Sequence, residues 1–480
     1  MEEENIANYI QRGFEDIYST SQTFSSRLIS PSSQWQAVLP NEVRDSLGCE
    51  VSVEEIKAAL WSMKVFKALS PDGLHARFFQ RFWLIVGDSV VKEIQKIFKE
   101  KIVPEVLNRT HIALFPKVQG PKLLNNYRPI SLCNSVYKIT TKVIVARLRP
   151  HLDQVVNLLQ TTFVPNRRGT NNAIIVQELI HTISKAKGKE WYMAIKIDLE
   201  KAYEKLEWSF IRAMLMRINL PQDKIQLIMS CVTSVSISIL FNRGTLESFH
   251  PCRCIRQGDP LSPYLFIICM DFLSQLIEEK CSEKLWTPVK SSKSGPAFSY
   301  LMFVDDVVLF AKANQVNCST IRDVLDLFCG KSGQSVNEAK TRVFFSPNVD
   351  NDTRESLYDI LGFQSTPSLG KYLGIPIKHQ GASSQDFNFV LDRVKQKLVG
   401  WKANLLSMVG RAVLIQSSLS MVPAYVMQCA QLPGKVLEGI DRVNRNFLWG
   451  STETSKKMHW IGWEKVTKPK KQGGSWTPNN

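Results

Sequence analysis

Three aspartates are the residues of this chain best suited to chemistry. Asp305 and Asp306 are adjacent and lie between two apolar runs, at residues 300–303 and 307–310. Such runs are typical of short buried strands, so we predict the pair at a hairpin connection. Two like charges there are costly unless cations compensate them, and carboxylate oxygens suit Mg²⁺. The pattern fits either a metal site or a solvated turn, where Asp is a common residue.

A third carboxylate, Asp198, ends a short stretch of alternating polar and apolar residues. A helical pattern is predicted to start around Lys201 and to continue through Ile211. Asp198 is therefore expected where a strand turns into a helix, which suits either a functional edge or an N-terminal helix cap. Together with Asp305 and Asp306 it could supply ligands for two metal ions that hold attacking and leaving oxygens about 4 Å apart.

A loop rich in turn residues could supply what the carboxylates lack. Residues 256–263 read Arg-Gln-Gly-Asp-Pro-Leu-Ser-Pro, and a largely buried helix is predicted at residues 264–277. Gly258 has no side chain, so backbone and ligand can approach closely there. Gln257 can hydrogen-bond a base or a sugar edge. The loop is predicted to cradle a nucleotide, with a plain strand-to-helix connector as the alternative.

These three segments, in this order, resemble the palm of a reverse transcriptase. More narrowly, they are similar to the reverse transcriptases of plant LINE-type retrotransposons, the class that lacks long terminal repeats. The resemblance covers most of the chain. Further matching segments lie at residues 52–60, 67–73, 78–83, 114–117, 126–133, 160–167, 332–337, 371–376 and 447–450.

The resemblance implies template-directed phosphoryl transfer. Asp198, Asp305 and Asp306 match the three metal-binding catalytic aspartates of the family, which implies two Mg²⁺ ions, with Mn²⁺ as an alternative. Lys340 matches a lysine that assists the leaving pyrophosphate. For Lys340 the alternative is a solvated surface lysine. The implied substrates are an RNA template, a DNA primer and dNTPs.

Five further positions match family residues that meet the incoming nucleotide. Tyr203 matches the aromatic residue under the sugar, which disfavours a 2′-hydroxyl. Gln257 and Gly258 match the loop beside nucleotide and template. Lys117 and Arg128 match basic residues that meet the triphosphate, although Lys117 also fits a solvated surface lysine.

The implied fold class is α+β with a right-hand polymerase architecture. It consists of a mostly helical N-terminal extension at residues 1–105, then fingers and a palm with an antiparallel sheet at 106–376. A helical thumb-like region at 377–480 would follow, broken into pieces by Pro423 and Pro433. The family pattern normally continues beyond the last residues, so we expect the chain to be either a fragment of a larger retroelement protein or a truncated open reading frame. Basic thumb residues that suit either a primer–template duplex or a solvated helical face are Lys402, Arg411, Arg442 and Arg445.

Four departures from the family pattern indicate relaxed constraint. Glu204 replaces a usual Asp, and Cys254 replaces a Gly where a special backbone angle is expected. Val304 replaces a small Ala before the aspartate pair, and Leu69-Ser70 replaces Pro-Gly. None of them removes a metal ligand. Two hypotheses remain open: a working polymerase, or a catalytically silent remnant that binds RNA or hybrid duplex without extending it.

Composition agrees with a polyanionic partner. The 480 residues carry 60 Lys and Arg against 44 Asp and Glu, a net charge of +16, which favours salt-sensitive nucleic-acid binding. The ten cysteines lack regular spacing and indicate reduced thiols and no zinc site. The acidic start and the short apolar runs predict no signal peptide, no transmembrane segment and no membrane partner. We expect a soluble nuclear or cytoplasmic protein.

Overall fold

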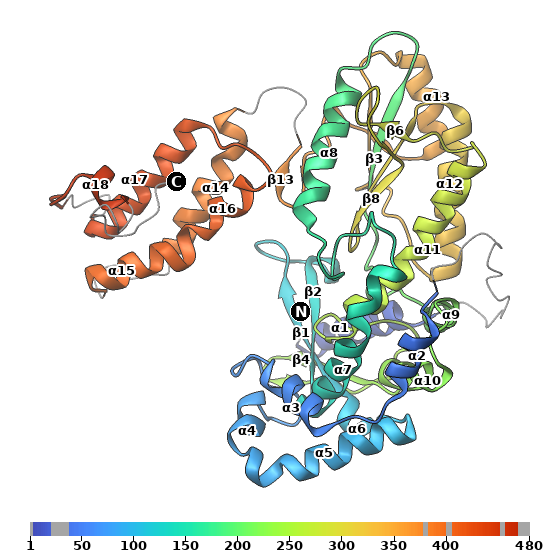
Figure 1. Cartoon of the computed structure of the whole chain (residues 1–480), viewed down its shortest axis with the longest axis vertical. Helices are drawn as coiled ribbons and strands as arrows, with labels where there is room; N and C mark the ends of the chain where they lie inside the picture. The colour runs from blue at the N-terminus through green and yellow to red at the C-terminus, as the bar shows by residue number, and fades with distance from the viewer. Residues whose placement is uncertain (1–2, 21–37, 378–382, 400–405, 452–456, 469–480) are drawn as a thin grey trace.

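The computed structural model combines two main sheets with helices that pack around them (Figure 1). This arrangement confirms the α+β fold class. The six helices before the first strand are α1 (Glu3–Tyr18), α2 (Asn41–Gly48), α3 (Val53–Trp61), α4 (Ala76–Arg81), α5 (Trp83–Glu100) and α6 (Glu105–Asn108). The structure describes residues 3–20, 38–377, 383–399, 406–451 and 457–468.

The first sheet has the strand order β2-β1-β4-β5. Its strands β1 and β2 are antiparallel, whereas β1 and β4 are parallel. Helix α1 covers this sheet, because Ile10, Phe14 and Tyr18 pack against Ile112 and Ile237 in one apolar cluster. The strands of this sheet are β1 (Arg109–Pro116), β2 (Tyr127–Cys133), β4 (Ser236–Phe241) and β5 (Gly244–Thr245). The 3-10 turn η1 (Leu124–Asn126) precedes β2, and α7 (Ser135–Leu148) and η2 (Arg149–Gln154) follow it.

The second sheet has the strand order β11-β10-β3-β9-β8. Its strands are β3 (Tyr192–Ile197), β8 (Tyr300–Phe303), β9 (Asp306–Lys312), β10 (Arg342–Phe345) and β11 (Gln364–Ser365). The helices before and between these strands along the chain are α8 (Gly169–Ser184), α9 (Trp208–Arg217), α10 (Gln222–Thr233), α11 (Ser262–Ser282), α12 (Gln315–Ser332) and α13 (Asn351–Leu361). Two ribbons pair β6 (Val289–Lys290) with β7 (Ala297–Phe298), and β12 (Lys371–Tyr372) with β13 (Ile375–Pro376).

Helices cover both faces of the second sheet, because alternate strand residues point to opposite sides. Ala194 and Val308 face α8, where they share an apolar cluster with Val176. Ile195 and Leu309 face the other way, into the large cluster that includes α11 and α12. Figure 1 shows α8 on one side of the strands and α11 to α13 on the other. The buried helix predicted after the glycine-containing loop is confirmed as α11.

The chain after Asp198 does not enter a helix at Lys201, so that expectation is wrong. Residues 201–205 form turns, and α9 begins only at Trp208. Two contacts keep the segment out of a helix: Leu199 pairs with Val336, and the Glu200 N–H donates to the Ser335 carbonyl at 2.9 Å. Lys201 then adopts a left-handed φ of +47°. Asp198 is therefore not a helix cap.

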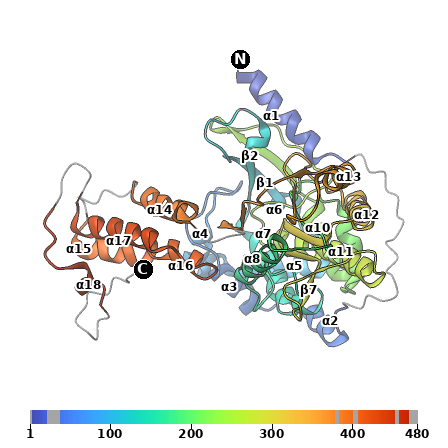
Figure 2. The same cartoon turned by 90° about the horizontal axis from the view of Figure 1, so that it is seen from above.

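Helices form the described part of the C-terminal region: α14 (Ser384–Val399), α15 (Met408–Leu414), the π-helical turn η4 (Ile415–Leu419), α16 (Met421–Met427), α17 (Gly434–Trp449) and α18 (Trp463–Val466). Figures 1 and 2 show this group to one side of the other elements. Pro433 separates two helices as predicted, but Pro423 lies inside α16. The preceding π turn, closed by the Ser420 N–H on the Ile415 carbonyl, brings the chain into α16 without a break. Lys402 lies outside the described residues.

Two further findings concern the cysteines and the possibility of a membrane-spanning helix. All ten cysteines are free. Within the described ranges, no helix is both long and apolar enough to cross a membrane.

Candidate active site

Strand register brings the three aspartates to one edge of the second sheet. Strands β3 and β9 are antiparallel, and their last pair is Ile197 with Val307. The next residue beyond that pair is Asp198 on β3 and Asp306 on β9, so these two aspartates lie at the same edge. Asp305 lies in the two-residue connection between β8 and β9. The predicted hairpin is confirmed, with Asp305 in its connection and Asp306 as the first residue of β9 rather than in the connection. Residues far apart in the sequence meet there.

The hairpin connection is strained. The last pair is Phe303 with Asp306, which leaves Val304 and Asp305 to close the turn. Val304 has a left-handed φ of +57°, an unfavourable conformation for a β-branched residue. Its N–H donates to Oε1 of the buried Gln160 at 3.2 Å, which helps to hold the turn. The hydrogen bond from Val304 to Gln160 thus holds the backbone that carries Asp305.

Burial and mutual repulsion disfavour the charged forms of the aspartates in this site. Neighbouring protein atoms remove water from the Asp305 carboxylate and raise its pKa, and the charges of Asp306 and Asp198 raise it further. Loss of solvation also raises the pKa of Asp306, as does Asp198, while Lys196 opposes the shift. Lys340 Nζ lies 3.9 Å from Asp198 Oδ2. Repulsion among carboxylates at one edge is the condition under which a bound cation is most stabilising.

The segment after α12 fixes Asp198 through its backbone. The Asp198 N–H donates to Thr341 Oγ1 at 3.2 Å, and the Asn337 N–H donates to the Asp198 carbonyl at 2.8 Å. The same segment carries Lys340, whose N–H donates to the Asn337 carbonyl. Sequence reasoning assigned no role to Asn337 or Thr341, because both act through contacts distant in sequence.

The three carboxylates suit Mg²⁺ in chemistry but do not form a closed cage. In the part of the chain that the structure describes, no three His, Cys, Asp or Glu side chains converge into a metal cluster. Mg²⁺ is commonly held by one or two carboxylates together with substrate phosphates and water. Asp198, Asp305 and Asp306 fit that open type of site, which a nucleotide would complete.

Tyr203 lies close to the carboxylates in the turn that follows β3. Its ring stacks on Phe266 of α11, with centroids 5.0 Å apart and planes 8° apart. Burial raises the pKa of Tyr203, and the nearby Asp305 and Glu204 raise it further. The residue is therefore a neutral, rigidly held ring beside Asp305.

The loop that carries Gln257 and Gly258 packs edge-on against strand β2. The Ser131 N–H donates to the Gln257 carbonyl at 2.7 Å. Gly258 has a φ of +112°, and a Cβ there would lie 2.8 Å from the Ser131 carbonyl oxygen. Only glycine fits this conformation and this close approach. The side chain of Gln257 donates from Nε2 to Glu204 Oε1 at 2.8 Å.

Arg256 anchors this loop from the interior and was not predicted as a site residue. Its guanidinium is buried and donates to Asn108 Oδ1 at 2.7 Å and to Thr110 Oγ1 at 2.9 Å. It also pairs with Asp259 Oδ2 at 3.1 Å and hydrogen-bonds the Tyr137 hydroxyl. The sequence showed a charged residue inside an otherwise turn-forming motif, but Asn108, Thr110 and Tyr137 are each more than a hundred residues away.

The basic residues Lys117 and Arg128 belong to the β1–β2 hairpin: Lys117 follows β1 directly, and Arg128 lies in β2. Arg128 pairs in register with Phe115, and both basic side chains are exposed. Lys117 Nζ donates to the Asn125 carbonyl at 3.2 Å. Partial burial lowers the pKa of Lys117, and the nearby Glu204 raises it. Neither cation is engaged in an ion pair among the described residues, so both are available to an anion.

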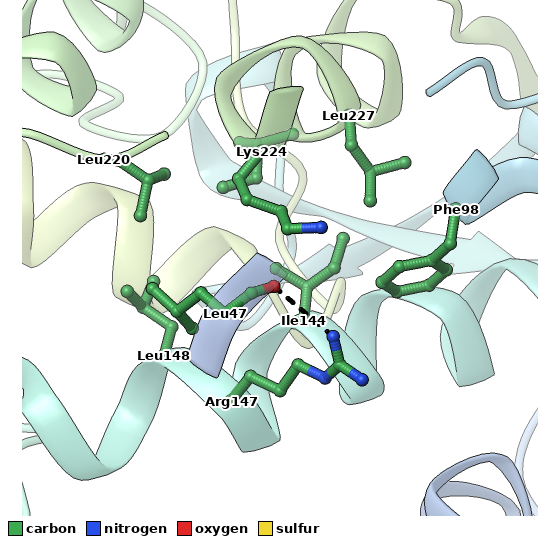
Figure 3. A pocket seen from close by; sticks show the side chains of 9 residues that line it. Leu47, Phe98, Ile144, Arg147, Leu148, Leu220, Lys224 and Leu227 are labelled. Atoms are coloured by element: carbon green, nitrogen blue, oxygen red, sulfur yellow. Dashed lines mark hydrogen bonds between the residues drawn. The ribbon is translucent and has the colours of Figure 1, made fainter. Parts of the chain in front are cut away.

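A small pocket lies elsewhere, between α5, α7 and α10 (Figure 3). Its volume is about 20 Å³, which is room for about one water molecule. Arg147 and Lys224 point toward it, but Arg147 is held by Glu55 through two contacts of 2.7 Å and by the Leu47 carbonyl at 3.4 Å. This pocket is a gap in packing and is too small for a nucleotide.

Comparison with known proteins agrees with the geometry. The chain is 24% identical to the transposon TX1 uncharacterized 149 kDa protein of Xenopus laevis, over 91% of this chain and 32% of that protein. It is 25% identical to the retrovirus-related Pol polyprotein of the type-2 retrotransposable element R2DM of Drosophila melanogaster, over 57% of this chain and 25% of that protein. An uncharacterized mitochondrial protein of Arabidopsis thaliana is 43% identical over 12% of this chain and 46% of that protein.

The chain thus spans about a third or less of the first two relatives. Both relatives support the expected type of retroelement, without long terminal repeats. The family model of reverse transcriptase (RNA-dependent DNA polymerase) matches residues 115–377, from the end of β1 to the residue after β13. That range includes the three aspartates, Tyr203, the Gln257–Gly258 loop and Lys340. The sheet edge and the sequence match lead to one conclusion: this chain belongs to the reverse transcriptase family.

Proposed function

We propose that this chain is an RNA-directed DNA polymerase that extends a DNA primer on an RNA template with dNTPs. The observation that carries the proposal is the register of β3 and β9, which brings Asp198 to the same edge as Asp305 and Asp306. Membership of the reverse transcriptase family supports it. A carboxylate edge beside a tightly packed glycine loop suits nucleotidyl transfer by positioning and electrostatics.

Asp198, Asp305 and Asp306 would hold two Mg²⁺ ions, or Mn²⁺. Bound ions would supply activation of the primer 3′-hydroxyl and neutralisation of charge on the pyrophosphate. The chain's own residues orient the carboxylates: Gln160 holds the turn that carries Asp305, and Thr341 holds the backbone of Asp198.

The remaining site residues would bind and orient the nucleotide. Lys117 and Arg128 would contact the triphosphate, because both are exposed cations near the carboxylates. Lys340 would assist the leaving pyrophosphate from its position near Asp198. The rigid Tyr203 ring would lie under the sugar and disfavour a 2′-hydroxyl, and the Gln257–Gly258 backbone would border the nucleotide and template.

We assign the wider architecture in the same way. Residues 106–376 would form fingers and palm, residues 377–480 a thumb, and residues 1–105 a helical extension. The separate helical group α14–α18 supports a thumb that closes on duplex (Figure 2). We assign the element to the plant LINE type: the similarity to an Arabidopsis thaliana protein supports a plant origin, and the similarities to the TX1 and R2DM proteins support an element without long terminal repeats.

A second function, duplex binding without extension, is favoured by two backbone angles. Val304 has a φ of +57° and Cys254 a φ of +135°, and both positions are occupied by larger residues than the family pattern expects. Strain of this kind is of the order of 1–3 kcal/mol per residue. Strain beside Asp305 and ahead of the Gln257 loop would impair catalysis before it impaired binding.

Primer extension on an RNA template separates the two functions. Purified protein with Mg²⁺ and all four dNTPs should extend a labelled DNA primer, and EDTA should stop extension. Template-dependent product supports the polymerase. Salt-sensitive duplex binding by folded protein with no product in Mg²⁺ or Mn²⁺ would contradict it and support the silent binder.

A further inference from the structure

Glu204 is a buried acid at the back of the candidate site. Its side chain lies in the turn after β3 and is 3% exposed. Oε1 accepts a hydrogen bond from Gln257 Nε2 at 2.8 Å. No group in the described part of the chain donates to Oε2. Gln257 is thus the one side chain among those residues that donates to this carboxyl group.

Burying this carboxyl group is unfavourable for the fold. Burial raises the pKa of Glu204, and four weaker effects oppose that shift: a hydrogen bond from its own backbone, the charges of Lys117 and Lys201, and the hydrogen bond from Gln257. Glu207, three residues later, is a buried acid of the ordinary structural kind. Its Oε1 accepts from Thr20 at 2.8 Å and lies 3.5 Å from Arg253. Glu204 lacks such partners, so its presence calls for another explanation.

The contact determines which atom Gln257 offers to a ligand. A carboxyl oxygen at this position accepts a hydrogen bond, so the Gln257 amide must turn Nε2 toward Glu204. Oε1 is then directed to the other side of the amide. The Gln257 backbone is already held by Ser131 at 2.7 Å. The half-buried Gln257 side chain therefore presents an acceptor in one orientation.

We propose that Glu204 is a positioning residue that holds Gln257 so that its Oε1 accepts a hydrogen bond from the incoming nucleotide. The donor would be a sugar hydroxyl, because a polymerase must accept all four bases at this position. The proposal rests on the proposed function, since it takes the Gln257 loop as the border of the nucleotide site. It adds a residue that acts through Gln257 and touches no substrate itself.

Three variants test this role. Glu204→Met keeps the length of the side chain but removes the acceptor, so the KM for each of the four dNTPs should rise about tenfold while kcat changes less. Its Tm should not fall, because an unfavourable buried acid is lost. Glu204→Asp keeps an acceptor, so the KM should rise less in this variant than in Glu204→Met. The matched control Glu207→Met should lower the Tm and leave the KM unchanged.

The outcomes separate this proposal from the proposed function. If the wild type extends primers and Glu204→Met lowers the Tm without changing any KM, Glu204 is merely structural and the proposal is overturned. An increase for one base only would also overturn it, because the donor would then be on that base. If the wild type does not extend, the proposed function fails. The Kd of each dNTP for the protein–primer–template complex in Ca²⁺ then decides: a value about tenfold weaker in Glu204→Met supports the positioning role, and an equal value overturns it.

Discussion

Cys254 shows how a single residue can retain backbone strain near the site. Its φ is +135°, its side chain is buried, and its carbonyl accepts from Trp208 Nε1 at 2.8 Å. The sequence indicated this strain correctly, because the family pattern has glycine there. Cys254 belongs to the segment that leads into Arg256 and Gln257, so relief of strain would act directly on the loop.

Replacing Cys254 by glycine should leave stability nearly unchanged. Relief of about 1–3 kcal/mol of strain offsets the lost thiol burial and the added freedom of the unfolded chain. Cys269, buried in the middle of helix α11, is the matched control. Cys269→Gly should destabilise by about 2 kcal/mol, from helix propensity and lost burial. Urea unfolding measures both variants, and equal losses would show that Cys254 is unstrained.

Asp271 is a buried acid that makes stability depend on pH. Burial raises its pKa to about 6, although the Asn157 N–H and Gln275 Nε2 each donate to it at 2.8 Å. The folded state therefore binds more protons than the unfolded state between about pH 4 and pH 6. The free energy of unfolding should fall as the pH rises through that window, by about 3 kcal/mol at most.

Asp271→Asn should flatten this part of the stability curve. The amide keeps an oxygen for the Asn157 N–H, and Gln275 can turn its unpaired Oε1 toward the new nitrogen. Urea unfolding at several pH values from 4 to 7 compares the variant with the wild type. An equally steep fall in both proteins would assign the pH dependence to other groups.

At the scale of elements, the site depends on the packing of the Gln257–Gly258 loop against strand β2. Local patterns predicted the β8–β9 hairpin and helix α11, because apolar runs and turn residues can be recognised within a short stretch of sequence. The start of α9 was mispredicted, because pairing of Leu199 with Val336 overrides the helical pattern. The contacts of Arg256 with Asn108 and of Asp198 with Thr341 are also long-range. No local pattern contains them, so sequence reasoning could not find them.

The fit of the Gln257–Gly258 loop against β2 can be tested by adding one methyl group. Gly258→Ala places a Cβ 2.8 Å from the Ser131 carbonyl, at a φ of +112°. We expect the loop to shift and extension to fall about tenfold or more, with a stability loss of about 1–3 kcal/mol. Gly120→Ala is the control, because Gly120 also has a positive φ, +66°, but open space around its Cβ position. Equal extension by the two variants would show that the close approach to Ser131 is unimportant.

At the scale of the whole molecule, the helical group α14–α18 has its own cores and also packs against the rest, because Cys429 is buried in one apolar cluster with Leu369 and Tyr372. Two apolar clusters lie within it, around Ile415 and around Val390. The described links to the body include the Tyr425 hydroxyl on the Leu373 carbonyl at 2.9 Å and Lys371 over the Phe389 ring at 3.9 Å. Tyr425 and Lys371 are exposed, so these two links are weak, and we expect this group to change its position when a duplex binds. The net charge of +16 favours such binding and makes it sensitive to salt.

The most direct test of the central claim compares primer extension with duplex binding in Asp305→Asn. This change removes the negative charge from the β8–β9 turn, and we expect single-turnover extension to fall about 10³-fold or more. The duplex Kd should stay within about threefold, because the residues expected to contact the duplex are cations at other positions. Asp323→Asn, on an exposed position of α12, is the matched control and should extend normally. Unchanged extension by Asp305→Asn would contradict the assignment of this sheet edge as the catalytic site.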